Sequence, residues 1–597
     1  MRDYFKPGIL LFTLLAFLFT ENSFSDDRFD RKKMSASMKE NDIIRTSTSY
    51  YTGPGLILEG YKYGDGGGFM VQPERQTGLS GFYDWQTNGE CKRHVYYVSP
   101  DVIHATMMTA FDSTMPDPSR RTVYTFSSDG GVSWWPIPVE VPNVRSGFAF
   151  LTAGNTGQSN GAAIIANHYN SPLRSYVHFD AFPGLGAFTS NPGPTPRFYI
   201  WPQANVMSNG NILVTANIYE NSIELDTIIM KTFNPNASSW EGVTNYFSTG
   251  VSNTYFSRWT SATGPDGKGL IVISPPNETG GSFFGSRIFY WTTNDYGNVW
   301  SGPSVLFDTQ IDQDGDTSKP WVGLDAVYDD FGNFYVSFNT TSLTGSYSSA
   351  KIWINRNGTQ NKVIARNTDI PGSMQTAATP QANVCSMDWP SLATTENGHF
   401  VVCAYSVAKQ NDIVNGFNSM DVYFSLVTAG LSVTGQPHAV TSGTNDERFV
   451  SLNRTVIDNY KIPLVYQKDP QPGSSSYSDV APVSRASLVY REIDFLNPLS
   501  GVEFTSSTAP NNYTLYQNYP NPFNPSTNIK FDIPKSGNVR ITVYDITGKQ
   551  IAELLNQNLS PGTYETNWDA DGFGSGVYFY SLEAEGFKET RKMLLIK

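Results

Sequence analysis

The chain has 597 residues and a formal net charge of −13, from 41 Lys and Arg against 54 Asp and Glu. Nucleic-acid binding needs clustered basic charge, so this balance argues against a nucleic-acid partner. The cysteines Cys91, Cys385 and Cys403 are too few for a disulfide framework, and no Cys/His cluster suggests a zinc site. A Cys385–Cys403 bridge remains an alternative to free thiols.

The first residues have the pattern of a secretory signal peptide. Arg2 and Lys6 precede an apolar run, Gly8–Thr20, that is short for a bilayer span. Ser23-Phe-Ser25 offers a cleavage site of small residues, which predicts a signal peptide over 1–25. An uncleaved membrane anchor is the alternative. We expect no transmembrane segment after cleavage.

A repeat begins near residue 80. The preceding stretch, 26–79, has no clear period and is expected to be loop-rich, with one candidate strand, LILEGYKY. Each repeat opens with a strand that carries an aromatic residue near its start. These residues are Tyr96, Phe148, Trp201, Trp259, Trp321, Trp389 and Phe449. Turns such as Asn209-Gly210 follow most copies, and a second apolar strand comes next.

A third strand recurs seven times. The copies are RTVYTF, SYVHFD, DTIIMKTF, SRIFYW, AKIWIN, DVYFSLV and ASLVYRE. A weaker fourth strand closes each unit. Repeated four-stranded antiparallel units predict an all-β protein, with a seven-bladed β-propeller over 80–507. Six blades are the alternative if one copy is irregular, whereas a two-layer sandwich fits units of this regular length poorly.

Two tight turns share the pattern Ser/Thr-x-Asp-x-Gly-x-x-Trp. Their residues are Ser127, Asp129, Gly131 and Trp134 in one turn, and Thr293, Asp295, Gly297 and Trp300 in the other. The hydroxyl and the carboxylate can accept bonds from turn amides, and the Trp packs beneath the turn. The pattern resembles the Asp-box of sialidase-like β-propellers. The resemblance implies a structural role on the face away from the usual pocket.

Basic residues stand just before the first strands of six repeats. They are Arg93, Arg145, Arg197, Arg258, Lys319 and Arg448. First strands start around the axis of a propeller, so these side chains are candidates for a ring that binds an anionic ligand. Alternatively, they pair with Asp388, Asp446 or Glu447 and merely connect blades. Aromatic residues at the same strand starts are candidate stacking platforms for a neutral sugar: Tyr199, Trp321 and Trp389.

Three carboxylates near the expected axis are candidates for acid/base catalysis: Asp325, Asp388 and Glu447. The Arg-Ile-Pro usual near the first blade of sialidases is absent, and Tyr460-Lys-Ile-Pro463 comes late with Lys in place of Arg. The chain thus departs from the sialidase pattern. Any enzyme activity is expected to be that of another glycoside hydrolase or a lyase.

Alternating carboxylates at Asp312, Asp314 and Asp316 resemble the start of a calcium loop. An EF-hand would have Gly at Thr317 and a later Glu, so these residues are not an EF-hand. A loop site for calcium and a solvated acidic turn are the two interpretations. No cofactor other than calcium is suggested.

The last part of the chain changes in composition. A polar linker is expected over 508–514, and 515–597 alternates like a small Ig-like sandwich. Its motifs include Tyr519-Pro-Asn-Pro-Phe-Asn-Pro525 and the ending Lys592-Met-Leu-Leu-Ile-Lys597. They closely resemble the type A C-terminal sorting domain of type IX secretion cargo, whereas a plain Ig-like adhesion module is the alternative. The resemblance implies the type IX machinery as a partner, and a secreted or outer-surface location.

Three functions fit these patterns. The first is an exported propeller that binds an extracellular ligand, expected to be an anionic glycan, without catalysis. The second is an exo-acting glycoside hydrolase or lyase, and the third is a structural or adhesive surface protein. The propeller fold alone does not choose among them.

Overall fold

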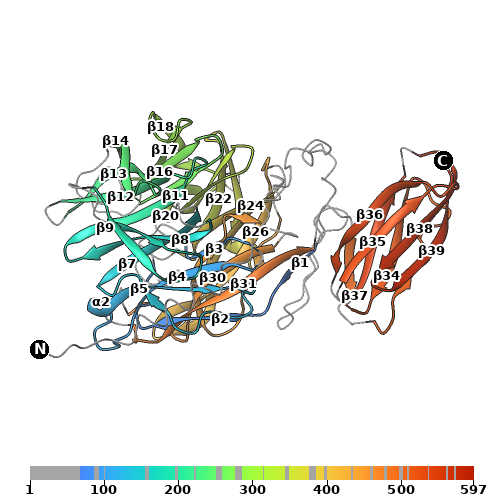
Figure 1. The fold of residues 1–597 in the computed structure, drawn as a ribbon, viewed down its shortest axis with the longest axis horizontal. Coiled ribbons are helices and arrows are strands. Elements are labelled where there is room, and N and C mark those ends of the chain that lie inside the picture. The colour runs from blue at the N-terminus through green and yellow to red at the C-terminus, as the bar shows by residue number, and fades with distance from the viewer. Residues whose placement is uncertain are drawn as a thin grey trace, which may run out of the picture. The chain divides into compact units, whose positions relative to one another are not determined.

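The structure is a computed structural model, and almost every described segment is a strand or a turn between strands (Figure 1). The described residues are 68–86, 93–99, 101–154, 160–194, 200–220, 223–250, 258–275, 286–312, 315–342, 349–374, 385–395, 400–431, 435–456, 461–475, 481–496, 502–506, 510–535, 537–559, 562–570 and 573–597. The predicted signal peptide lies outside them. Within these ranges, no helix has the length and hydropathy to cross a bilayer.

Seven sheets of four or five strands precede residue 497 in the described part of the chain, and we number them as blades 1 to 7. Blade 1 comprises β3 (Val95–Tyr97), β4 (Ile103–Ala110), β5 (Arg120–Ser127) and β6 (Val139–Glu140), with the short helix α2 (Pro116–Ser119) between β4 and β5. Blade 2 comprises β7 (Ser146–Gly154), β8 (Ala162–Asn170), β9 (Leu173–Asp180) and β10 (Phe188–Pro192). Blade 3 comprises β11 (Ile200–Val206), β12 (Ile212–Glu220), β13 (Ile223–Asn234) and β14 (Ser239–Ser248).

The next three blades repeat this order. Blade 4 comprises β15 (Arg258–Thr263), β16 (Gly269–Ser274), β17 (Arg287–Thr293) and β18 (Ser301–Asp308). Blade 5 comprises β20 (Thr317–Tyr328), β21 (Phe334–Thr341), β22 (Lys351–Arg356) and β23 (Gln360–Arg366), with β19 (Gln310–Ile311) at its edge and the 3₁₀ turn η2 (Asn367–Asp369) after it. Blade 6 comprises β24 (Met387–Thr395), β25 (Phe400–Val414), β26 (Phe417–Thr428) and β27 (His438–Ala439), with β29 (Thr455–Val456) parallel to β24.

Blade 7 joins the two ends of the propeller. Its strands are β28 (Asp446–Leu452), β30 (Lys461–Asp469) and β31 (Ala486–Leu496), and β31 pairs with the early strands β1 (Gly68–Val71) and β2 (Arg75–Gly81). The propeller therefore starts before residue 80, the start expected from the repeat. RQTGLSG has little apolar alternation, and its pairing with β31 spans most of the chain, so no local pattern marks it.

All seven predicted third strands lie in different blades, and every predicted first-strand aromatic lies in a first strand. The second strands β8, β16 and β21 are almost wholly buried. Neighbouring blades cover both of their faces, which explains why these strands are continuous apolar runs. The outermost strand β18 is mostly exposed, as its polar sequence predicts.

The C-terminal module is a sandwich of two sheets. One sheet holds β32 (Val502–Ser506), β37 (Gly562–Asp569), β34 (Ser526–Ile533) and β33 (Thr514–Leu515). The other holds β36 (Gln550–Leu559), β35 (Gly537–Tyr544), β38 (Gly576–Ala584) and β39 (Phe587–Leu595). Inward-facing residues such as Phe531, Ile541 and Trp568 form its core. Because β32 pairs with β37, the sandwich takes up residues that precede the expected linker.

Candidate functional site

The first strands of several blades share an irregularity near their starts. Phe148, Trp201, Trp389 and Phe449 have φ between 51° and 54°, and the strand register shifts at each of them. A large side chain seldom adopts positive φ, so such a residue is held there by its surroundings. The bulge turns the aromatic ring out of the strand's regular alternation.

These rings meet at the end of the axis where the first strands begin. Trp389 lies 4.4 Å from Phe449, and Trp85 lies 6.0 Å from Trp389, measured between ring centroids. Phe148 and Trp201 belong to the same buried cluster. We call this cluster the aromatic floor.

The candidate stacking platforms Trp321 and Trp389 are 4% and 1% exposed. Their rings therefore pack inside the protein and do not present a face to solvent. The third candidate, Tyr199, lies outside the described residues.

Arg93 lies deep on the axis and connects four blades. Its guanidinium donates to the carbonyl oxygens of Leu392 and Leu452, each at 3.0 Å, and of Ala326 at 3.4 Å. It also forms an ion pair of 2.8 Å with Asp325, and both side chains are at most 2% exposed. These contacts are those of an inter-blade connection.

A second arginine, Arg454, was not among the basic residues predicted to stand before the first strands. Arg454 follows β28, donates to the carbonyl oxygen of Ser261 in blade 4 at 3.3 Å, and lies over the Phe150 ring of blade 2. Burial, followed by the nearby charge of Arg93, lowers the pKa of Arg454 to about 9. No sequence signal distinguishes it from other arginines that follow a strand.

Arg448 and Arg258 are also buried, at 2% and 6% exposed. Arg448 forms an ion pair of 2.7 Å with Asp446, two residues earlier, and its guanidinium lies over the Trp389 ring. Burial raises the pKa of Asp388, and the nearby charge of Arg258 opposes that rise.

Two other members of the basic series are more accessible. Arg145 keeps 38% of its side chain exposed and pairs with Asp117, which also binds Arg120. Lys319 is partly buried, and desolvation lowers its pKa. The last member, Arg197, lies in a stretch that the structure does not describe.

The three candidate carboxylates are at most 1% exposed. Asp388 accepts hydrogen bonds from Asn339 Nδ2 at 2.9 Å and from the Trp389 and Cys385 amides. Burial raises the pKa of Asp388 to about 7, and these bonds oppose the rise. Burial also raises the pKa values of Asp325 and Glu447.

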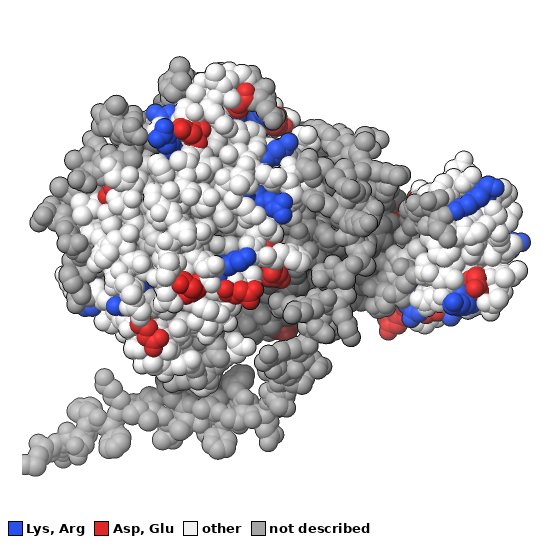
Figure 2. All heavy atoms as spheres, turned by 90° about the horizontal axis from the view of Figure 1, so that it is seen from above, with Lys and Arg blue, Asp and Glu red and all other residues white. Residues whose placement is uncertain are grey.

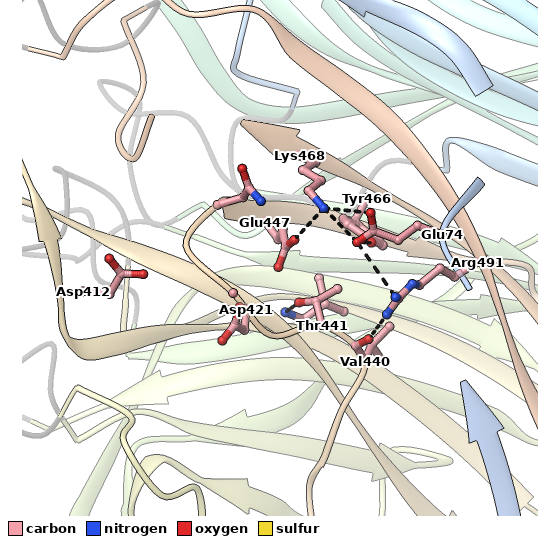
Figure 3. A network of polar contacts seen from close by, with 12 residues as sticks. Glu74, Asp412, Asp421, Val440, Thr441, Glu447, Tyr466, Lys468 and Arg491 are labelled. Atoms are coloured by element: carbon pink, nitrogen blue, oxygen red, sulfur yellow. Dashed lines mark hydrogen bonds and ion pairs between the residues drawn. The ribbon is translucent and has the colours of Figure 1, made fainter. Parts of the chain in front are cut away.

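A polar network joins blades 6 and 7 around Glu447 (Figure 3). The carboxyl groups of Asp421, in β26, and Glu447, in β28, both belong to this network. Burial is the main cause that raises the pKa of Asp421, to about 7. Lys409 lies 3.3 Å from Asp421, and Lys468 lies 3.7 Å from Glu447.

The outer part of this network reaches the surface. Figure 3 shows Lys468 between Glu447 and Glu74, with Arg491 on the far side of Glu74. Lys468 pairs with Glu74 at 2.7 Å, and Tyr466 donates to Glu74 at 2.9 Å. Sequence reasoning did not find Asp421, Lys468 or Glu74, because they lie far apart in the chain and share no motif.

Both predicted Asp-box turns lie between the third and fourth strands. In blade 4, the Thr293 hydroxyl donates to Asp295 at 2.6 Å, and the Val299 amide donates to the same carboxylate at 2.9 Å. Trp300 packs against Phe247 with ring centroids 5.0 Å apart. In blade 1, the equivalent bonds join Ser127, Asp129, Gly131 and Ser133, and Trp134 packs on Tyr490. At Gly131, with φ of 79°, a Cβ would lie 2.4 Å from that tyrosine ring.

The acidic stretch before β20 holds an internal cation. Lys351 Nζ pairs with both Asp312 and Asp316, and Asp312 also accepts from the Ser318 hydroxyl at 2.8 Å. Asp314 is not among the described residues. Among those that are, no group of three His, Cys, Asp or Glu has the arrangement of a metal site.

Cys385 and Cys403 are free, buried thiols, so the alternative of a bridge between them is wrong. Both pack in the apolar core shared by blades 5 and 6, where a thiol behaves as a small apolar group. Cys91 lies outside the described residues.

Comparison with known proteins adds one firm result. Residues 517–597 match the secretion system C-terminal sorting domain, so the chain is a type IX secretion cargo that reaches the cell surface or the medium. No curated protein matches the chain.

Solved propeller hydrolases are only distantly similar. Trypanosoma rangeli sialidase with the inhibitor DANA is 9% identical, with 88% of this chain and 90% of that chain covered and a TM-score of 0.31. Penicillium chrysogenum α-L-arabinanase with arabinobiose is 11% identical, with 57% and 92% covered and a TM-score of 0.34. Likeness at this level carries no inference about activity.

Proposed function

We propose that this exported propeller binds an extracellular glycan and does not cleave it. The sorting domain sends the chain to the cell surface or the medium, where the accessible ligands include glycans. Four-stranded blades around an axis provide a rigid support for polar groups at one end. Those groups surround the aromatic floor.

The burial of the three candidate carboxylates is the observation that favours binding over cleavage. Glycoside hydrolysis by the usual mechanism needs two carboxyl groups about 5 to 10 Å apart, both facing the substrate. Asp325 and Asp388 are bound internally, and Glu447 is 1% exposed and lies 3.7 Å from the Lys468 ammonium group. None of the three candidates presents an oxygen to a ligand.

The groups available for binding lie around this buried centre. Charged side chains that are part-exposed come from three places: Arg145, from the start of blade 2; Lys409 and Asp412, from the end of β25; and Glu74 and Lys468, from blade 7. They include both signs, so they can donate to and accept from sugar hydroxyls. Burial of the groups beneath them keeps this arrangement rigid.

A glycan array with the mature chain tests the proposal. We expect retention of at least one glycan class, with the bound glycan recovered intact by mass spectrometry. A replacement at the accessible rim, Lys409→Gln, is expected to weaken retention, whereas Arg287→Gln, in an exposed pair on blade 4, should not. Retention of no glycan would overturn the proposal.

The second candidate function is an exo-acting glycoside hydrolase or lyase, which would require Asp388 to reach the substrate from its buried position. A carboxyl that titrates near pH 7 suits general acid/base catalysis. If a retained glycan is instead shortened, Asp388→Asn should abolish turnover while binding persists. Turnover that survives this substitution would remove Asp388 from the mechanism.

A further inference from the structure

A cavity of about 310 Å³ lies at the outer edge of the propeller, away from the axis. It is between the fourth strand of blade 5 and the segment that precedes the fourth strand of blade 6. Its lining includes Lys362, Ile364, Arg366, Asp369, Gln436 and Pro437. Fourth strands are the outermost in each blade, so this cavity is separate from the aromatic floor. Its volume is at the lower end of the range for small-molecule sites and suits a single sugar ring.

The two walls of the cavity are fixed by packing. Ile364 is 3% exposed and belongs to the core that includes Met387 and Val427 of blade 6, so this part of β23 rests on that blade. On the opposite wall, the Gly435 amide donates to the carbonyl oxygen of Leu426 at 2.8 Å. Lys362 and Arg366 flank Ile364 along the strand.

The cavity lining carries more positive than negative charge. Asp369 is committed to Arg366, through an ion pair of 3.7 Å and a bond of 3.0 Å from the Arg366 amide. Among the described residues, Lys362 has no ion-pair partner. The Gln436 side chain likewise has no hydrogen-bond partner among them. The cavity thus holds one uncommitted ammonium group and one uncommitted amide.

We propose that this cavity binds the carboxylate of an acidic sugar, such as a uronic acid residue of a glycan. Lys362 would pair with the carboxylate, and the Gln436 amide would donate to it or to a ring hydroxyl. Pro437 supplies an apolar surface for the C–H face of the sugar. A neutral sugar has no group for the ammonium. This inference rests on the proposed function, because it takes a glycan as the ligand.

Calorimetric titration of the mature full chain tests the inference. The probes are a glucuronic-acid-containing disaccharide and its counterpart with the carboxyl reduced to an alcohol. We expect tighter binding of the acidic probe, and we expect Lys362→Gln to weaken that binding roughly tenfold or more. Added salt should weaken it too. Because Lys362 makes no ion pair, the variant should keep the parent's melting temperature.

Lys231→Gln is the matched control. It removes one positive charge from β13 in blade 3, where Lys231 also has no ion-pair partner in the described part of the chain, and it should bind like the parent. Equal binding of both probes, or unchanged binding by Lys362→Gln, would overturn the inference. If other glycans still bind, the proposed function survives that result. If the parent binds no glycan at all, both proposals fail.

Discussion

Arg93 and Arg454 show how single side chains connect several blades of the propeller. Together they form hydrogen bonds, an ion pair or ring contacts with blades 2, 4, 5, 6 and 7. A buried charge is costly unless it is paired and hydrogen-bonded, and Arg93 has both kinds of partner. Arg93, which sequence reasoning assigned to a ligand-binding ring, therefore stabilises the fold.

Replacing Arg93 should destabilise the propeller strongly. In Arg93→Met, Asp325 keeps a buried charge without its closest partner, so we expect a loss of about 3–5 kcal/mol in the free energy of unfolding. Urea denaturation of the mature chain measures this loss. Arg287→Met is the control: its pair with Asp308 is about half exposed, so its loss should stay below about 1 kcal/mol. Equal midpoints for the two variants would contradict the assignment.

The buried carboxyls Asp388 and Asp421 predict an unusual pH dependence. Their pKa values are raised to about 7 in the folded chain, so the folded state holds protons that the unfolded state releases above about pH 4. Their contribution to stability is complete below about pH 4 and is lost as pH rises through about 7. Each group changes the unfolding free energy by up to about 1.4 kcal/mol per pH unit within that window.

Urea midpoints from about pH 4 to about pH 8 measure this slope, because this range covers the window in which these groups titrate. Asp421→Asn removes one titrating group and should flatten the slope. Asp295 is the control carboxylate: it is half-buried, and its pKa is lowered chiefly by its bond from Thr293, so it affects the slope only at lower pH. A slope that is the same in parent and Asp421→Asn would argue against the raised pKa of Asp421.

The turns between third and fourth strands show how a short motif stabilises one element. The Thr293 hydroxyl donates a hydrogen bond to the Asp295 carboxylate and accepts one from the Gly297 amide. Trp300 packs over the turn and contacts Phe247 of blade 3. The motif therefore fastens a turn to the neighbouring blade. It lies at the end of the strands opposite to the aromatic floor, since third strands run from that end toward the turn.

Trp300→Ala should destabilise the chain by about 2–4 kcal/mol without changing its ligand preference. The loss comes from the removed ring contact and from the cavity that remains. Urea denaturation gives the stability, and the glycan array gives the preference. A variant as stable as the parent but unable to bind would show that the turn takes part in recognition.

Figure 2 shows that charged residues are sparse and of both signs on one side of the molecule, with wide uncharged areas between them. The net charge of −13 is thus not concentrated in one acidic region of that face. Local groups such as Lys362 or Arg145, and not the overall field, are then expected to select a ligand.

Closure of the ring depends on strands that are far apart in the chain. Blade 7 takes β1 and β2 from the start of the described residues and β28, β30 and β31 from the end of the propeller. This pairing satisfies edge groups that an open array would expose. The sandwich has its own core and its own sheets.

Removing residues 497–597 should leave a folded propeller that is no longer exported. The match to a sorting domain lies within 517–597, and blade 7 ends with β31 at Leu496. Cell fractionation of the host, with the full chain as control, measures the location. Arrival of the truncated chain at the surface or in the medium would refute the assignment.

A further removal of 68–81 should lower the urea midpoint, because blade 7 then loses its outer strands.

The repeat, its strands and the sorting domain were all predictable from the sequence. Each blade carries its own aromatic start, turn and apolar runs, and these signals are local. The bulges at Phe148 and Trp201, the closing strands β1 and β2, and the contacts of Lys409 with Asp421 and of Lys468 with Glu447 were not predictable in this way. They depend on contacts between residues far apart in the chain. Whether an arginine faces a ligand or a buried carboxylate depends on how closely the blades pack, and only the tertiary structure determines that distance.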